Sequence, residues 1–153
     1  KHYGNIPKNI ERVQQGYELI KILNRATEDQ PGEEYFDLLQ TAFEALDNPD
    51  VNLVLINAWF SAQLLKYGGH EPNLHTDNAN QPLNPSTCFD FMFDDMVFAP
   101  KPNGFFTADH IKFLRLLFGG SKPSAIAKVS GAEQLAEVCA PLINTVRNTY
   151  IRI

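Results

Sequence analysis

One apolar segment, residues 49–67, limits the possible folds of this chain more than any other feature. Its hydrophobic side chains lie on every side of a helix: Leu53, Val54, Leu55, Ile56, Trp59, Phe60, Leu64 and Leu65. A helix that is apolar all round is surrounded by other elements. Polar residues interrupt the run, which is shorter than the roughly 20 apolar residues of a membrane span, so we expect no membrane segment. The segment therefore predicts a central helix.

The ends of this helix are predicted from capping residues. Asn48 is a suitable N-cap and Pro49 a suitable first helical residue. The Gly68-Gly69 pair favours a helix end, because glycine adopts the left-handed conformation without a clash. We expect the central helix to span about residues 49–67.

The flanking segments carry amphipathic helical patterns. The first helix, with Pro7 in its first turn, has an apolar stripe of Ile6, Ile10, Val13, Tyr17 and Ile20. Leu19 and Leu23 widen this stripe, so we expect the helix to be embedded rather than laid on a surface. The second has an apolar face of Phe36, Leu39, Phe43 and Leu46. Thr107 is a suitable cap for a helix over residues 108–118. Residues 123–153 predict one or two helices, with Pro141 starting a new helix or kinking a long one. The predicted fold is mainly α, a five- to six-helix bundle.

Residues 88–106 have a different periodicity. Phe89, Phe91 and Phe93 alternate with polar or smaller residues, which is the pattern of a half-buried strand. The Pro102-Asn103-Gly104 sequence is typical of a turn. We therefore expect a small β-hairpin near residues 88–106. The rings of Phe105 and Phe106 are expected in the core, and stacking on nucleic-acid bases is the alternative.

Length and composition are those of one globular domain over residues 1–153. At 44% hydrophobic and 20% charged residues, the chain can bury a core without a disulfide or metal. The two cysteines, Cys88 and Cys139, are far apart, and the first residues have no signal-peptide pattern. We expect a cytoplasmic protein. Because the sequence has no initiator Met, we also expect it to be a piece of a longer chain.

Charge is distributed unevenly along the sequence, although the net charge is only −5. Residues 1–25 and 96–128 are rich in lysine and arginine, whereas residues 26–65 contain eight acidic residues and no basic ones. The two basic segments are predicted to converge on one face as a site for DNA or an acidic partner, and separate solvated faces are the alternative. The candidate residues are Lys21, Arg25, Lys101, Lys112, Arg115, Lys122 and Lys128.

A cluster of ionisable residues follows the glycine pair: His70, Glu71, His75 and Asp77. Its spacing matches no established metal motif, and Asp77 and Asn78 favour Asx turns, so a connecting loop is expected. A metal-dependent hydrolase that uses His70, His75 and Asp77 is a further hypothesis. His110 is expected to be a partly buried, hydrogen-bonded side chain. Since no catalytic motif is present, we expect neither enzymatic activity nor a cofactor.

The order of these features resembles the C-terminal helical domain of RecO, a bacterial recombination mediator and DNA-annealing protein. The resemblance runs from "YFDLLQTAFEAL" through "AWFSAQLLKYGGHEPNL" and "GFFTADHIKFLRLL" to "AIAKVSGAEQLAEVCAPLINTVRNTYI". Its second segment is similar to the family pattern "FExxLLxxLGYxPxL". In the family, an N-terminal OB-fold precedes this domain, and nothing in these residues matches it. Many relatives also carry paired CxxC zinc ligands, whereas "HTDNANQPLNPSTCFDF" has a single cysteine, so a zinc-free member is implied.

The resemblance implies a nucleoid-associated mediator rather than an enzyme. Its implied partners are single-stranded DNA, the acidic tail of single-strand-binding protein and a RecR-like protein. Some relatives have arginines ahead of the position of Phe60, where that tail docks, but this chain has Asn57, Ala58 and Trp59 there. The charge would then come from Lys21, Arg25, Lys112 or Arg115, beside an apolar pocket with candidate residues Trp59, Phe60 and Phe113. A helical scaffold or regulatory domain with no nucleic-acid role is the alternative.

Overall fold

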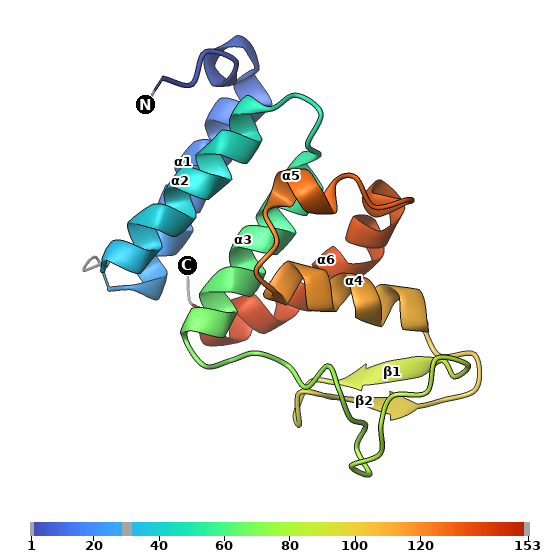
Figure 1. Ribbon diagram of the computed structural model, residues 1–153. Helices are drawn as coiled ribbons and strands as arrows, with labels where there is room; N and C mark the ends of the chain where they lie inside the picture. The colour runs from blue at the N-terminus through green and yellow to red at the C-terminus, as the bar shows by residue number, and fades with distance from the viewer. Residues whose placement is uncertain (1, 29–31, 152–153) are drawn as a thin grey trace.

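The computed structural model describes residues 2–28 and 32–151 of the chain. Within these ranges the protein is a helical bundle with one small antiparallel hairpin, as predicted (Figure 1). In chain order the elements are η1 (Ile6–Lys8), α1 (Ile10–Ala26), α2 (Glu33–Asp47), α3 (Leu53–Tyr67), β1 (Phe89–Met92), β2 (Val97–Pro100), α4 (Ala108–Phe118), α5 (Pro123–Ile126) and α6 (Ala132–Tyr150). No helix in these described ranges has the length and apolarity to cross a membrane.

Helix α3 is the centre of the bundle, which confirms the prediction from its apolar sequence. It packs against α1, α2, α4, α5 and α6. Its residues 58–65 are all buried. In Figure 1, α1 and α2 lie on one side of α3, whereas α4 lies on the other side with the hairpin beyond it. The bundle therefore has two halves that share one helix.

The predicted start of the central helix is wrong by four residues. Asn48 ends α2, residues 49–51 form a turn, and α3 begins at Leu53. Asn52 is the N-cap, with its side-chain oxygen accepting from the backbone N–H groups of Val54 and Leu55 at 2.7 and 3.3 Å. The intervening backbone is instead bound by the guanidinium of Arg12, a long-range contact that local capping rules do not describe.

Arg12 is a buried cation that joins α1 to the α2–α3 junction; its side chain is only 8% exposed. Its shortest hydrogen bonds run from Nη1 to the carbonyls of Leu46 and Asn48, at 2.8 and 3.1 Å, and from Nη2 to Val51, at 2.7 Å. These carbonyls lie at and after the C-terminal end of α2, where the helix dipole is negative. One guanidinium therefore satisfies backbone acceptors that the turn leaves open.

The buried face of α1 differs from the predicted apolar stripe. Ile10 and Tyr17 are 69% and 72% exposed, and the face toward the core carries Arg12, Gly16, Leu19, Ile22 and Leu23. Pro7 lies in η1, and α1 itself begins after the N-cap Asn9. Among the described elements α1 packs against η1, α2 and α3, and its wide apolar surface is covered only in part.

The apolar face of α2 is likewise covered only in part. Its buried residues are Leu38, Ala42, Ala45 and Leu46. Phe36, which the sequence pattern places on the apolar face, is exposed. The α1–α2 pair therefore has hydrophobic side chains on its outer surface.

The hairpin follows its predicted alternation. Phe89 pairs with Pro100 and Phe91 with Phe98, and the rings of Phe89 and Phe91 are buried. Phe106 is buried as expected, but Phe105 is 65% exposed, so the prediction that it packs in the core is wrong. The strand is too short to carry Phe93, which lies in the turn after β1 and is 45% exposed.

The structure also shows where α3 ends and how many helices the C-terminal region forms. Gly69 has φ +80° and ends α3 as predicted. The C-terminal region forms the short helix α5 and the long helix α6, with Pro141 inside α6 rather than at its start. Cys139 lies on the buried face of α6, and burial raises the pKa of its thiol to about 12.

Candidate functional site

The loop after α3 is organised by turns, as predicted for its polar residues. The Asp77 side chain accepts from the N–H groups of Ala79 and Gln81 at 2.8 and 3.0 Å. The ring of His70 stacks on Tyr150 with a centroid distance of 4.0 Å. In the part of the chain that the structure describes, no group of three or more His, Cys, Asp or Glu side chains is placed to hold a metal ion. The polar side chains of the loop thus form its turns.

His110 caps its own helix and is part-buried, as expected. Its Nδ1 accepts from the backbone N–H of Thr107 at 3.0 Å, which satisfies a donor at the start of α4. Burial lowers the pKa of this imidazole, and the nearby Asp109 opposes that effect. The neutral ring is therefore the form that fits this position.

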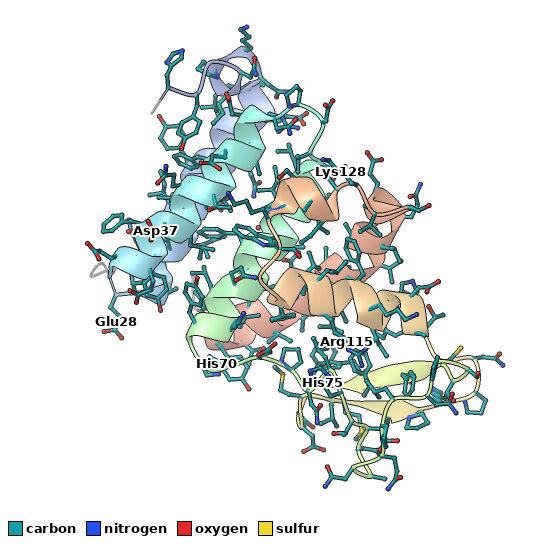
Figure 2. The ribbon with its side chains drawn as sticks, viewed as in Figure 1. Glu28, Asp37, His70, His75, Arg115 and Lys128 are labelled. Carbon is teal, nitrogen blue, oxygen red and sulfur yellow. The ribbon has the colours of Figure 1, made fainter. Side chains whose placement is uncertain are left out.

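Arg115 has a structural contact that the sequence does not reveal. Its Nε and Nη2 donate to the carbonyl of Leu74 at 2.9 and 2.7 Å, so the side chain ties the loop after α3 to α4. Figure 2 places Arg115 between α4 and the hairpin. With Lys112 it borders a cavity of only about 50 Å³ that Leu83, Pro85 and Phe89 also line. This space is far below the roughly 300–1,000 Å³ of typical ligand sites.

The predicted basic residues fall into separate groups rather than one patch. Lys21 and Arg25 lie on α1, on the opposite side of α3 from α4 (Figure 1). Lys128 follows α5, on the side of α4 away from the hairpin, whereas Arg115 lies on the hairpin side (Figure 2). Lys101 forms a salt bridge with Asp90 at 3.0 Å, and its hydrogen bond lowers the pKa of that carboxyl. The two basic segments thus do not converge on a single face.

Two of the three predicted pocket residues belong to the core. Phe60 and Phe113 are 0% and 1% exposed, so both rings pack inside the core. Trp59, by contrast, lines a cavity of about 270 Å³ between α2, α3 and the α4–α5 loop, which we call the Trp59 pocket. Its lining residues are Asp37, Leu38, Thr41, Trp59, Gln63, Lys66, Tyr67, Gly119, Gly120, Ser121 and Lys122.

Side chains of α3 hold the α4–α5 loop at this pocket. The indole Nε1 of Trp59 donates to the carbonyl of Ser121 at 3.0 Å. The Gln63 amide donates to the carbonyls of Leu117 and Gly119 at 2.7 and 2.9 Å, where α4 leaves acceptors without helical partners. These bonds fix the loop next to α3, and they place Lys122 at the same pocket as Lys66.

Lys66 is the residue of this pocket that the charge analysis missed. It lies at the end of the helix, in a stretch where acidic residues dominate, so counting charges along the chain hides it. Lys122 comes from a segment 56 positions later, and only the fold brings the two lysines to one pocket. Asp37 is the acidic residue among the lining side chains.

A second basic residue that sequence reasoning missed is Arg147 of α6. Its guanidinium donates to Ser61 Oγ at 3.1 Å and to Asn57 Oδ1 at 3.5 Å on α3. Burial lowers the pKa of this guanidinium, and the charge of Glu18 on α1 opposes that effect. Asn57 is one of the positions where the resemblance leads one to expect arginine, so α6 provides a cation to that face of α3.

A family model matches most of this chain. The family described as "Recombination protein O C terminal" matches residues 14–121, which is more than half of the chain. Neither the curated proteins nor the solved structures include a significant match. The matched region runs from α1 to the α4–α5 loop and contains nearly all of the Trp59 pocket. The chain therefore belongs to the RecO family of recombination and DNA-repair proteins, through its C-terminal domain.

Proposed function

We propose that this chain is the zinc-free C-terminal domain of a cytoplasmic, nucleoid-associated recombination mediator, and that the Trp59 pocket binds the acidic tail of single-strand-binding protein. The observation that carries the proposal is that Lys66 and Lys122, from distant segments, line one pocket together with Trp59, Leu38 and Tyr67. Its role is binding rather than catalysis, with single-stranded DNA and a RecR-like protein as further partners.

The chemistry of the pocket suits the end of an acidic peptide. Two ammonium groups attract carboxylates. The ring of Tyr67, which is 43% exposed, and the edges of the mostly buried Trp59 and Leu38 provide apolar contacts for a terminal hydrophobic side chain. The volume is below the roughly 300–1,000 Å³ of typical small-molecule sites, which favours one or two inserted side chains. Asp37 on the opposite wall would repel a second carboxylate, so it restricts the orientation of the peptide.

The distribution of exposed cations does not favour strong binding of single-stranded DNA. The exposed cations on α1 and α4 lie on different sides of the bundle, so phosphate contacts would be few for any one strand. Few contacts give a shallow dependence of affinity on salt. We infer that this domain contributes weakly to DNA binding and that its main task is to bind protein.

The chain contains a single tryptophan, so its emission reports directly on the pocket. Titration with a fluorescein-labelled acidic peptide that ends in Phe should change both peptide anisotropy and Trp59 fluorescence. Lys66→Glu and Lys122→Glu should each weaken binding by about tenfold or more, as expected for the loss of one charge-assisted contact. Added salt should weaken binding further.

Lys21→Glu is the matched control, because Lys21 is an exposed lysine on α1 and lies outside the pocket. It should leave the affinity within about twofold of the wild-type value. Equal losses in all three variants would mean that the peptide responds only to net charge. Absence of peptide and DNA binding at low salt would favour the helical scaffold.

A further inference from the structure

We propose that the groove between the hairpin and α6 binds a basic, apolar-flanked segment of a protein partner. This site goes beyond the proposed tail-binding function, since it lies on other elements and has the opposite charge. The groove has a volume of about 460 Å³. It is lined by Asp90, Phe91, Phe93, Phe105, Phe106, Glu137, Val138, Pro141, Leu142 and Thr145, and we call it the hairpin groove.

The exposed rings of the groove are held in place from beneath. Phe93 packs edge-on against the buried Phe91 at a centroid distance of 4.9 Å, and Phe105 packs edge-on against Phe106 at 5.1 Å. Phe98 contacts both of the buried rings, at 4.9 and 5.5 Å. The five rings thus form one connected chain with an exposed member at each end. Fixed rings lose little conformational freedom when a ligand binds, which favours recognition.

The charges around these rings are mainly negative. Residues 89–106 carry three aspartates and one lysine, and residues 132–145 carry two glutamates and no lysine or arginine. The lysine, Lys101, is already paired with Asp90. Glu137 lines the groove with an exposed side chain and, among the described residues, has no salt bridge. The groove therefore offers a negative potential beside aromatic faces.

Pro141 adds a backbone acceptor to this face of α6. As an internal helical residue without an N–H, it cannot donate to the carbonyl of Glu137 four residues earlier. Both residues line the groove, and Thr145 lies one turn further along the helix. The Thr145 hydroxyl donates to the carbonyl of Pro141 at 2.8 Å, so the Glu137 carboxylate is the main polar group that this wall offers to a ligand.

This combination fits an arginine or lysine side chain that is followed by bulky apolar residues. Its cationic head would lie over the face of Phe93 or Phe105 and reach Glu137, while apolar neighbours would cover Val138 and Leu142. A nucleic-acid strand also stacks on exposed rings, but its phosphates would be repelled by Glu137 and the aspartates of the hairpin turn. Charge thus favours a basic peptide over DNA.

The test uses the whole chain and a fluorescein-labelled octapeptide of alternating arginine and leucine. A glutamate–leucine octapeptide and a labelled oligo-dT strand serve as comparisons. We expect saturable binding of the arginine peptide, with little binding of the other two. ¹⁵N amide shifts should change in residues 89–106 and 132–145. Shifts concentrated elsewhere, or stronger binding of oligo-dT at the groove, would overturn the proposal.

Variants distinguish binding at the hairpin groove from nonspecific electrostatic attraction to the protein. Phe105→Ala and Phe93→Ala truncate exposed rings, and each should weaken arginine-peptide binding by about two- to fivefold. Glu137→Lys should weaken it by about tenfold. Glu133→Lys makes the same charge change one turn away on α6 but outside the lining residues, so its effect should stay within about twofold. Equal effects of the two charge variants would contradict a specific site.

Discussion

Arg12 and Arg115 use the same chemistry in two regions of the molecule with different burial. Each guanidinium binds backbone carbonyls of a segment far away in sequence: Arg12 the α2–α3 junction and Arg115 the loop after α3. Arg12 is buried and binds several carbonyls, whereas Arg115 is exposed and binds that of Leu74 with two nitrogens. The contacts of Arg12 thus support the whole bundle, whereas those of Arg115 hold one loop.

The largest expected effect is that of Arg12→Met. The change keeps an apolar stem but leaves the carbonyls of Leu46, Asn48 and Val51 without their donor in a buried site. The free energy of unfolding should fall by about 3–5 kcal/mol, because each unsatisfied buried acceptor costs about 1–3 kcal/mol. Urea denaturation followed by circular dichroism measures this loss. A loss below about 1 kcal/mol would show that water replaces the guanidinium.

Arg12→Lys tests whether the planar fork matters or only the charge. A lysine ammonium cannot span carbonyls that Nη1 and Nη2 reach in different directions. We expect an intermediate loss of about 1–3 kcal/mol in the same denaturation experiment. If Arg12→Lys is as stable as the wild type, the positive charge near the end of α2 is sufficient.

Arg115→Met should have a smaller and more local effect. Two hydrogen bonds to the carbonyl of Leu74 are lost at an exposed position, where water can take their place. We therefore expect the free energy of unfolding to fall by about 1–2 kcal/mol. Amide hydrogen exchange should accelerate in residues 72–83 and remain unchanged in α1 and α2. Faster exchange throughout the bundle would mean that Arg115, like Arg12, stabilises the whole bundle.

The smallest effect is expected at the other end of α4, from His110→Gln. Burial lowers the pKa of His110, so the unfolded chain takes up the proton first. The stabilisation from the neutral ring is present above the ordinary histidine pKa of about 6.5 and is lost as the pH falls through the lower folded-state pKa. Glutamine can keep the acceptor for Thr107 but does not titrate.

The measurement for His110→Gln is urea denaturation at pH 7.5 and pH 5. The variant should lose less stability than the wild type on acidification, while the two should be similar at pH 7.5. The same loss in both proteins would assign the pH dependence to other groups.

The features that were predictable from the sequence are those encoded locally. The all-round apolarity of α3, the glycine end at Gly69 and the alternation of Phe89 and Phe91 each depend on neighbouring residues only. They were sufficient for the fold class and for the resemblance to RecO. The capping preference of Asn48 predicts the wrong start for the central helix, because its carbonyl is bound by Arg12, a side chain 36 residues away.

The candidate site was less predictable because it depends on contacts between helices. Lys66 and Lys122 belong to segments of opposite charge balance, and their proximity follows from the hydrogen bonds of Trp59 and Gln63 to the α4–α5 loop. The cation beside Asn57 comes from Arg147, 90 residues later. Counting charges along a sequence cannot identify such pairs.

Cys139 gives the protein an internal reporter of global unfolding. Thiolate, not thiol, reacts with alkylating reagents, and because burial raises the pKa of Cys139 to about 12, its thiol stays protonated at pH 7. The side chain is also fully buried on α6, against the backbone of His110. Cys88, which is half-buried before β1, lacks this degree of protection. Labelling kinetics at the two positions therefore distinguish local opening near the hairpin from unfolding of the whole bundle.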